Sequence, residues 1–153
     1  MKKISILLLL VLLLSFVSCN QELQYWKFEY NCSEITEIKI INIPPTLSLT
    51  SDHKAYPIIK QLDLSVSEQL YADIEKLPMK KYGFNLAEPY GNCFIIVYKN
   101  GDFDIISALE PTRFRYDEKY SCLQPYISWL KCDEEEFNLL IDKYLNMEQS
   151  IKT

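Results

Sequence analysis

Residues 93–109 constrain the fold more than any other part of this 153-residue chain. Two runs of mainly apolar residues flank the dipeptide Asn100-Gly101, which is typical of a two-residue type I′ turn because both residues tolerate positive φ. That turn predicts a register in which Ile96 lies opposite Ile105. One face of the hairpin then carries Phe94, Ile96, Tyr98, Phe103 and Ile105, and the other carries Cys93, Ile95, Val97, Ile106 and Ala108. Because both faces are apolar, we expect the hairpin in the middle of a sheet that is covered on both sides. If only one side were covered, the other would be a sticky surface for a partner.

Two amphipathic helices are predicted, at about residues 66–77 and 134–147. The first is expected to begin with a capping box of Ser65 and Glu68. The second follows Asp133, which suits the N-cap position. The apolar residues of the two helices recur at helical spacing: Val66, Leu70, Ile74 and Leu77 in the first, and Phe137, Leu140, Ile141, Tyr144 and Leu145 in the second.

Further strands are expected before the first helix and after the hairpin. Residues 35–43 are rich in β-branched side chains, and residues 58–64 form a second, weaker candidate. Residues 120–132 predict another strand, interrupted at Pro125. Together these segments predict an α+β domain with a small, mainly antiparallel sheet around the central hairpin and two amphipathic helices.

The N-terminus carries the pattern of a secretory signal peptide. Lys2 and Lys3 precede an apolar run over residues 4–17, and a basic start followed by a short apolar run is typical of exported proteins. A transmembrane helix needs about 20 apolar residues, and this run is shorter. It ends at Phe16-Val17-Ser18-Cys19, which resembles the lipobox of bacterial lipoproteins, although that family usually has leucine where Phe16 stands.

The resemblance implies that residues 1–18 are removed as a lipoprotein signal peptide and that the thiol of Cys19 receives a diacylglycerol. Such an anchor is enough for stable membrane attachment. The alternatives are an ordinary cleaved signal peptide and a single N-terminal membrane anchor. After cleavage, residues 19–30 are expected to form a tether and residues 31–153 a single domain.

The charge of the mature chain limits its partners. Of 16 basic residues, Lys2 and Lys3 are lost with the signal peptide, and the remaining 14 stand against 21 acidic residues, a formal charge of −7. An acidic chain without a basic stripe argues against nucleic acid, because phosphate neutralisation dominates that affinity. It also argues against electrostatic docking on anionic lipid. A basic protein partner is allowed, although such a charge also simply keeps small proteins soluble.

Four cysteines remain besides Cys19, and an even number outside the cytoplasm suggests disulfides. We expect Cys122 to pair with Cys132, because they flank one extended segment, which leaves Cys32 to pair with Cys93. Free, buried thiols are the alternative.

The sequence predicts no catalytic residue, no metal site and no cofactor. The acid run 133–136 is what the helix dipole favours in a first helical turn. His53 is the only histidine, too few for the usual zinc ligand sets without cysteines. Arg113 and Arg115 would clamp an anion if the chain there were extended, but a solvated loop rim is the favoured interpretation.

Residues 79–91 are expected to form a loop in which aromatic side chains have no sheet to pack against. Tyr82, Phe84 and Tyr90 are therefore predicted as anchors for a protein partner, since tyrosine carries much of the energy at many interfaces. The alternative is that these rings fold back on the core.

These patterns together predict a lipid-anchored protein of the bacterial cell envelope, on the inner or the outer membrane. Its single domain is expected to be non-enzymatic and to bind a protein, as an immunity-type protein against an envelope-targeting toxin would. The alternatives are an envelope enzyme that acts on cell-wall or glycan fragments, and a structural subunit of an envelope complex.

Overall fold

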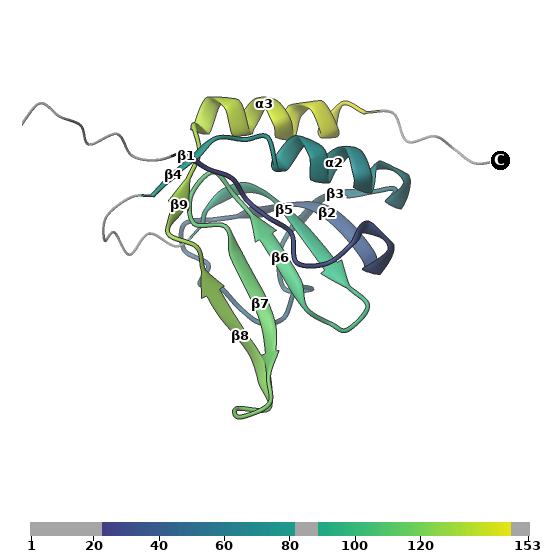
Figure 1. Ribbon diagram of the computed structural model, residues 1–153, viewed down its shortest axis with the longest axis vertical. Coiled ribbons are helices and arrows are strands. Elements are labelled where there is room, and N and C mark those ends of the chain that lie inside the picture. Colours follow the sequence, from purple (N-terminus) through teal and green to yellow (C-terminus); the bar gives the residue numbers. More distant parts are fainter. Residues whose placement is uncertain (1–22, 82–88, 148–153) are drawn as a thin grey trace, which may run out of the picture.

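A computed structural model describes residues 23–81 and 89–147 of the chain (Figure 1). Two helices and two antiparallel sheets place the domain broadly in the α+β class, as predicted. The expectation of one small sheet is wrong, because the strands divide into a six-stranded and a three-stranded sheet. Within the described ranges, no helix is long and apolar enough to cross a membrane.

The larger sheet has the strand order β3-β2-β5-β6-β7-β8, and the smaller has the order β1-β4-β9. The strands of the larger sheet are β2 (Ile35–Ile43), β3 (Ile58–Leu62), β5 (Gly91–Tyr98), β6 (Phe103–Ile106), β7 (Thr112–Asp117) and β8 (Cys122–Ile127). Those of the smaller sheet are β1 (Leu23–Gln24), β4 (Met79–Lys81) and β9 (Leu130–Lys131). The helices are α2 (Ser67–Ile74) and α3 (Glu134–Leu145), with 3₁₀ turns η1 (Cys32–Glu34) and η2 (Leu64–Val66).

The predicted strands at 35–43 and 58–64 are confirmed as β2 and β3. The strand predicted over residues 120–132 is divided between the two sheets. Its break falls not at Pro125, which lies inside β8, but just before β9, where Trp129 has a φ of +52°. The break turns the chain from the larger sheet into the smaller one.

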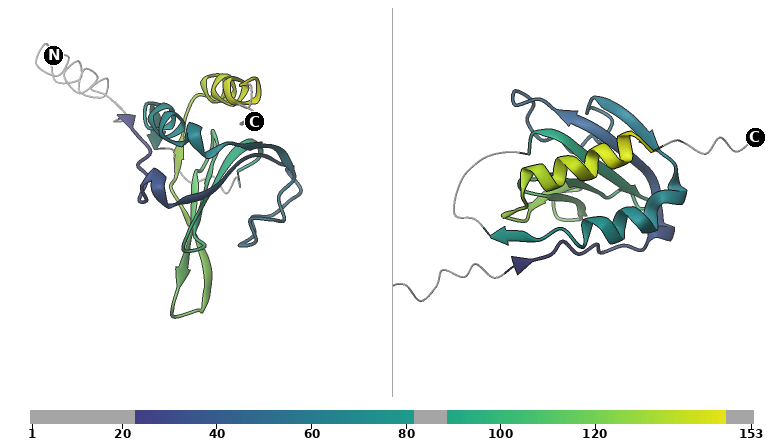
Figure 2. Two further views of the ribbon diagram at one scale, coloured as in Figure 1. Left: turned by 90° about the vertical axis from the view of Figure 1, so that its right-hand side faces the viewer. Right: turned by 90° about the horizontal axis from the view of Figure 1, so that it is seen from above.

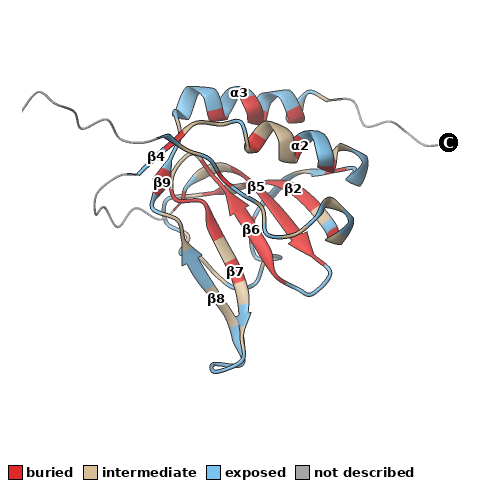
Figure 3. Cartoon of the chain, in the orientation of Figure 1, coloured by how far each residue is buried: buried red, intermediate tan, exposed pale blue. Residues whose placement is uncertain are grey.

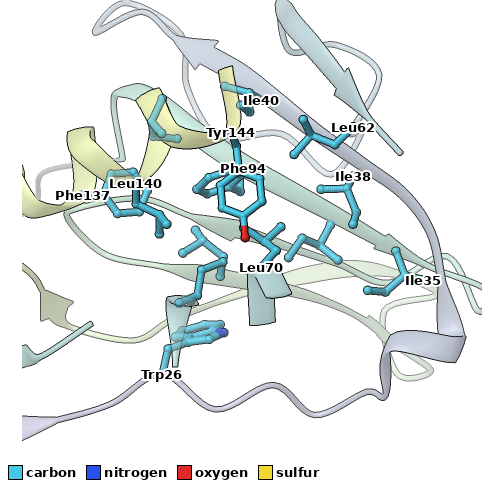
Figure 4. Close-up of a cluster of buried hydrophobic side chains, with 14 of the residues drawn as sticks. Trp26, Ile35, Ile38, Ile40, Leu62, Leu70, Phe94, Phe137, Leu140 and Tyr144 are labelled. Atoms are coloured by element: carbon cyan, nitrogen blue, oxygen red, sulfur yellow. The ribbon is translucent and has the colours of Figure 1, made fainter. Parts of the chain in front are cut away.

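Strands β5 and β6 occupy the middle of the larger sheet, which confirms the predicted position of the hairpin. Helices α2 and α3 cover one face (Figure 2). The core beneath them includes Phe94 (Figure 4), and Ile106 belongs to the same cluster. The opposite face is covered by the chain between β2 and β3, which contributes Leu47 and Tyr56 to the hydrophobic cluster that contains Ile95. Both faces of the hairpin are therefore buried, as its apolar pattern required.

The predicted register of this hairpin is wrong by one residue. The amide of Tyr98 donates to the carbonyl of Asp102 at 2.9 Å, so the loop holds three residues instead of two. Among the described residues of this loop, only Gly101 has a positive φ, +88°, which fits a type I turn followed by a left-handed residue. Consequently Ile96 lies opposite Asp104, while Ile105 lies opposite Ile95 on the other face.

The second predicted helix is confirmed, and the first is shorter than expected. Asp133 caps α3 by accepting hydrogen bonds from the amides of Glu135 and Glu136 at 3.0 and 3.1 Å. The capping box predicted at Ser65 is wrong: Asp63 instead caps the 3₁₀ turn η2, accepting from the amide of Ser65 at 2.8 Å. The 3₁₀ turn takes up only Val66 of the predicted helix, and α2 ends at Ile74, three residues earlier than predicted.

The described part of the expected tether belongs to the folded domain. Residues 23–30, here called the strap, run along the domain with alternate side chains turned inward. Leu23 pairs with Lys80 of β4, Trp26 is 3% exposed, and the ring of Phe28 stacks on Tyr71 with centroids 3.6 Å apart. The folded domain therefore includes residues 23–30, which the sequence assigned to the tether.

Candidate binding site

A buried ion pair lies at the base of the β7–β8 hairpin. The three-residue turn places Asp104 on the helix-side face of β6, where it is fully buried. Arg115 Nη2 donates to its Oδ1 at 2.8 Å, and the Tyr98 hydroxyl donates to its Oδ2 at 2.9 Å. Burial raises the pKa of Asp104 above its usual range, although Arg115 and Tyr98 oppose the shift. Because this carboxylate is closed to solvent, its role is structural.

The two arginines of β7 fasten the strap to the sheet. Arg113 Nη1 donates to Glu29 Oε1 at 2.5 Å, and Arg115 Nε donates to Glu29 Oε2 at 2.9 Å. The guanidinium of Arg113 also lies 4.3 Å from the ring centroid of Trp26. The arginine pair does clamp an anion from an extended strand, but the anion is Glu29 of the same chain. The solvated rim that the sequence favoured is wrong.

The two arginines of the clamp shift the pKa of Glu29. Burial raises the pKa of this carboxyl, but hydrogen bonds and charge from Arg115 and Arg113 outweigh burial and leave the pKa below its usual value. A second contact lies at the end of the strap, where the Tyr30 hydroxyl donates to Asp102. Asp102 also accepts from the backbone amide of Tyr116 at 3.0 Å. The strap is therefore held at several points.

A cleft of about 510 Å³ lies between the strap and the β7–β8 hairpin. Its walls include Trp26, Arg113 and Leu130, and Tyr25 and Tyr126 stand beside them with 46% and 52% of their surfaces exposed. Tyrosine, tryptophan and arginine are the residues enriched at the energetic centres of protein interfaces. We call this feature the strap cleft.

The hairpin itself projects from the domain (Figure 2), and much of β8 is exposed along its length (Figure 3). Tyr116 and Tyr120 are 57% and 59% exposed on it. Strand β8 is an edge of the larger sheet, and Pro125 removes one backbone donor from it. Because proline blunts strand addition at an edge, side chains are better placed than the backbone to bind a partner here.

The partner-binding residues predicted from the sequence lie elsewhere or outside the described ranges. Tyr90 is 50% exposed and lines a different cleft, of about 560 Å³, together with Leu23 and Lys80. Tyr82 and Phe84, like the acylation candidate Cys19, fall outside the described residues. Tyr90 is thus the one predicted anchor whose exposure can be stated.

The four cysteines in the described part of the chain are free thiols, so neither expected disulfide is formed in this structure. Cys32 packs on the helix-side core and Cys93 lies in the core of the opposite face, so the sheet separates them. Cys122 begins β8 at the hairpin tip, and β8 alone spans about 17 Å on the way to Cys132. A disulfide needs Cα atoms within about 7 Å.

Two other candidates take structural positions. The acid run 133–136 forms the N-cap and first turn of α3, as predicted. The imidazole of His53 packs against Phe103, with ring centroids 5.7 Å apart. In the described ranges, no three His, Cys, Asp or Glu side chains are grouped so that they could hold a metal ion.

Comparison of the chain with protein-family models, curated proteins and solved structures found no match. The site therefore has to be judged on its own residues. The sequence pointed to the 79–91 loop and missed the strap cleft, although one signal was present. Trp26, Phe28 and Tyr30 alternate with Lys27 and Glu29, and that period of two is typical of an extended segment with one buried face.

Proposed function

We propose that the protein is a lipid-anchored protein of the bacterial cell envelope whose folded domain binds another protein through the strap cleft. The anchor is supported by the sequence pattern that ends at Cys19. The binding role is carried by one observation: Tyr25 and Tyr126 stand about half exposed beside a cleft that contains Trp26 and Arg113.

The ion pairs of the strap favour tight binding at this place. Glu29 is fixed by both arginines of β7, and Trp26 is held under the guanidinium of Arg113. A surface that is already ordered loses little conformational entropy when a partner binds, and more of the contact energy remains as affinity. The strap cleft therefore suits a partner side chain that inserts between Tyr25 and Tyr126.

The charge of the chain bears on the kind of partner. At −7 the mature chain attracts basic proteins at long range, while Lys27, Arg113 and Arg115 stand near Glu29 in the cleft lining. An immunity-type role against a toxin that reaches the envelope is the most specific form of this proposal, and it rests on address and charge. Asp104, the most deeply buried acid near the cleft, lends no support to the glycan-enzyme alternative, because it is closed to substrate.

The anchor is tested with Cys19→Ser in intact cells. We expect the variant to lose labelling by a fatty-acid probe and to leave the membrane fraction, because the thiol is the acylated atom. Unchanged labelling would remove the lipoprotein assignment.

The binding site is tested with Tyr126→Ala and Tyr25→Ala, with Tyr90→Ala as a matched control of similar exposure on a different cleft. The partner is captured by crosslinking in intact cells with the wild-type protein, and affinities are then measured with purified proteins. Truncation of a true anchor costs on the order of 2 kcal/mol, or roughly thirtyfold in Kd. The melting temperature should change little, since both rings are half exposed. Equal affinity for all variants would reject the strap cleft as the site.

A further inference from the structure

The packing of the strap limits how far the domain can stand from its proposed anchor. If residues 19–30 were all free, eleven peptide steps would reach about 40 Å. Because Leu23 belongs to the folded domain, where it pairs with Lys80, only four peptide steps separate it from Cys19, and these reach at most about 14 Å. The headgroup layer of one leaflet is about 5–7 Å thick. The end of the domain that carries Leu23 must therefore stay within or just above the headgroups.

The side chains at this end suit that position. Leu23, Lys80 and Lys131 lie in one row across the smaller sheet, so they share a face. Leu23 is 49% exposed, and both lysines are exposed. Tyr90, 50% exposed, lines the same cleft of about 560 Å³. Tyrosine rings and lysine stems both place an apolar part in the interface and a polar end in water. We call these four residues the anchor face.

The charges around the anchor face are mixed. Asp133, Glu134 and Glu136 line the same cleft as the lysines. Electrostatic attraction to anionic lipid therefore does not drive the contact, which agrees with the acidic character of the chain. The short distance to Cys19 and the amphipathic side chains are sufficient to account for a contact between the anchor face and the membrane.

We infer that the anchor face rests on the headgroup layer of the membrane in which Cys19 is anchored. This inference rests on the proposed lipid anchor. It assigns Tyr90 to the membrane instead of to a protein partner. It also determines which end of the domain points away from the membrane. Lys99 lies nine residues beyond Tyr90, at the other end of β5, and is therefore about 30 Å from Tyr90.

The experiment compares two tryptophan reporters at the two ends of β5. Tyr90→Trp and Lys99→Trp are made separately in a Trp129→Phe background, where the only other tryptophan is the buried Trp26. The acylated proteins are reconstituted in vesicles of phosphatidylethanolamine and phosphatidylglycerol that contain a lipid with a nitroxide on its headgroup. We expect the emission of the Tyr90→Trp reporter to be strongly quenched and that of the Lys99→Trp reporter to stay close to its value in unlabelled vesicles.

The possible results distinguish a failure of the proposed lipid anchor from a failure of the proposed orientation of the domain. Protein that does not float with the vesicles would contradict the proposed lipid anchor. Protein that floats but shows equal quenching at both positions would overturn the anchor face alone. Quenching by aqueous acrylamide should show the reverse contrast, with the Tyr90→Trp reporter shielded. The contrast should persist in vesicles of phosphatidylcholine alone, and a contrast that requires anionic lipid would contradict the argument from reach.

Discussion

The β5–β6 hairpin and the β7–β8 hairpin follow one another in the larger sheet, but they are covered differently. All four residues of β6 are buried, whereas none of the six residues of β8 is. The first hairpin lies between the helices and the 44–57 segment, and its side chains form two cores. The second contributes Phe114 and Leu123 to one core and turns several tyrosines to solvent. The first hairpin is thus part of the buried core on both of its faces, whereas the second leaves much of its surface exposed to solvent.

A comparison of thiols tests this contrast and has the largest expected effect. Cys93 lies in β5, where burial raises its pKa to about 12, and Cys122 is exposed in β8. A thiol reagent should modify Cys122 in the native protein at least about a thousandfold faster than Cys93, because Cys93 needs an opening that costs about 5 kcal/mol or more. Mass spectrometry of timed samples identifies the sites. In denaturant without reductant, all four thiols of the domain should react. Fewer than four reactive thiols would support the disulfides that the sequence predicts.

The ion pair that joins the two hairpins is expected to have the next largest effect. Arg115→Ala removes the main charge partner of the fully buried Asp104. An unpaired buried charge typically costs about 3–5 kcal/mol of unfolding free energy, which urea denaturation can measure. Adding Asp104→Asn should recover much of the loss, because the remaining side chain is neutral. Lys119→Ala, at the exposed hairpin tip, is the control. A loss no larger than that of the control would show that the pair does not join the hairpins.

The turn of the buried hairpin comes third. Gly101→Ala should cost about 1–2 kcal/mol, because a side chain at a φ of +88° is strained. A Cβ there meets no atom within 4 Å, so the cost is backbone strain and not a clash. Denaturation with urea gives the value, and Lys99→Ala in the same loop should be nearly neutral. A neutral Gly101→Ala would argue against the three-residue turn.

The smallest effect is expected at the strap. The pKa of Glu29 in the folded protein is lowered below its usual value of 4.5. The unfolded state therefore takes up a proton first as the pH falls. The stability that ionised Glu29 contributes at neutral pH is lost as the pH falls through its folded pKa. Glu29→Gln should therefore be less stable than wild type at neutral pH and approach it in acid. Melting temperatures over this range measure the difference, with the exposed Glu118→Gln as control. If the difference in melting temperature between wild type and Glu29→Gln did not depend on pH, the charge of Glu29 would not be the source of its effect on stability.

Much of the fold followed from local patterns in the sequence. The β-branched run at 35–43, the helical stripe after Asp133 and the doubly apolar hairpin each predicted an element that the structure contains. These signals are strong because burial on a defined face imposes a period on the side chains. The strap carries such a period too, but nothing in the local sequence shows what a short segment packs against, so the sequence alone predicts a tether at Trp26 and its neighbours.

The candidate site was much harder to predict from the sequence than the fold. For Arg113 and Arg115 the sequence favours a solvated loop rim over an anion clamp, and no local pattern indicates that Glu29, more than eighty residues earlier, is the anion. Tyr25 and Tyr126 are brought beside one cleft only because the strap is fastened to β7. Contacts between residues so far apart in the chain leave no mark in a local pattern.

The sequence by itself determined the strands β2 and β3, the helix after Asp133, and the burial of the 93–109 hairpin on both faces, but it did not reveal the strands β1, β4 and β7. The tertiary structure decided the register of that hairpin, because Asn100-Gly101 fits both a two-residue and a three-residue loop. In the three-residue form Asp104 turns into the core, and that is tolerable only where Arg115 and Tyr98 reach its carboxylate. These partners lie outside the turn, and only the folded chain brings them to Asp104.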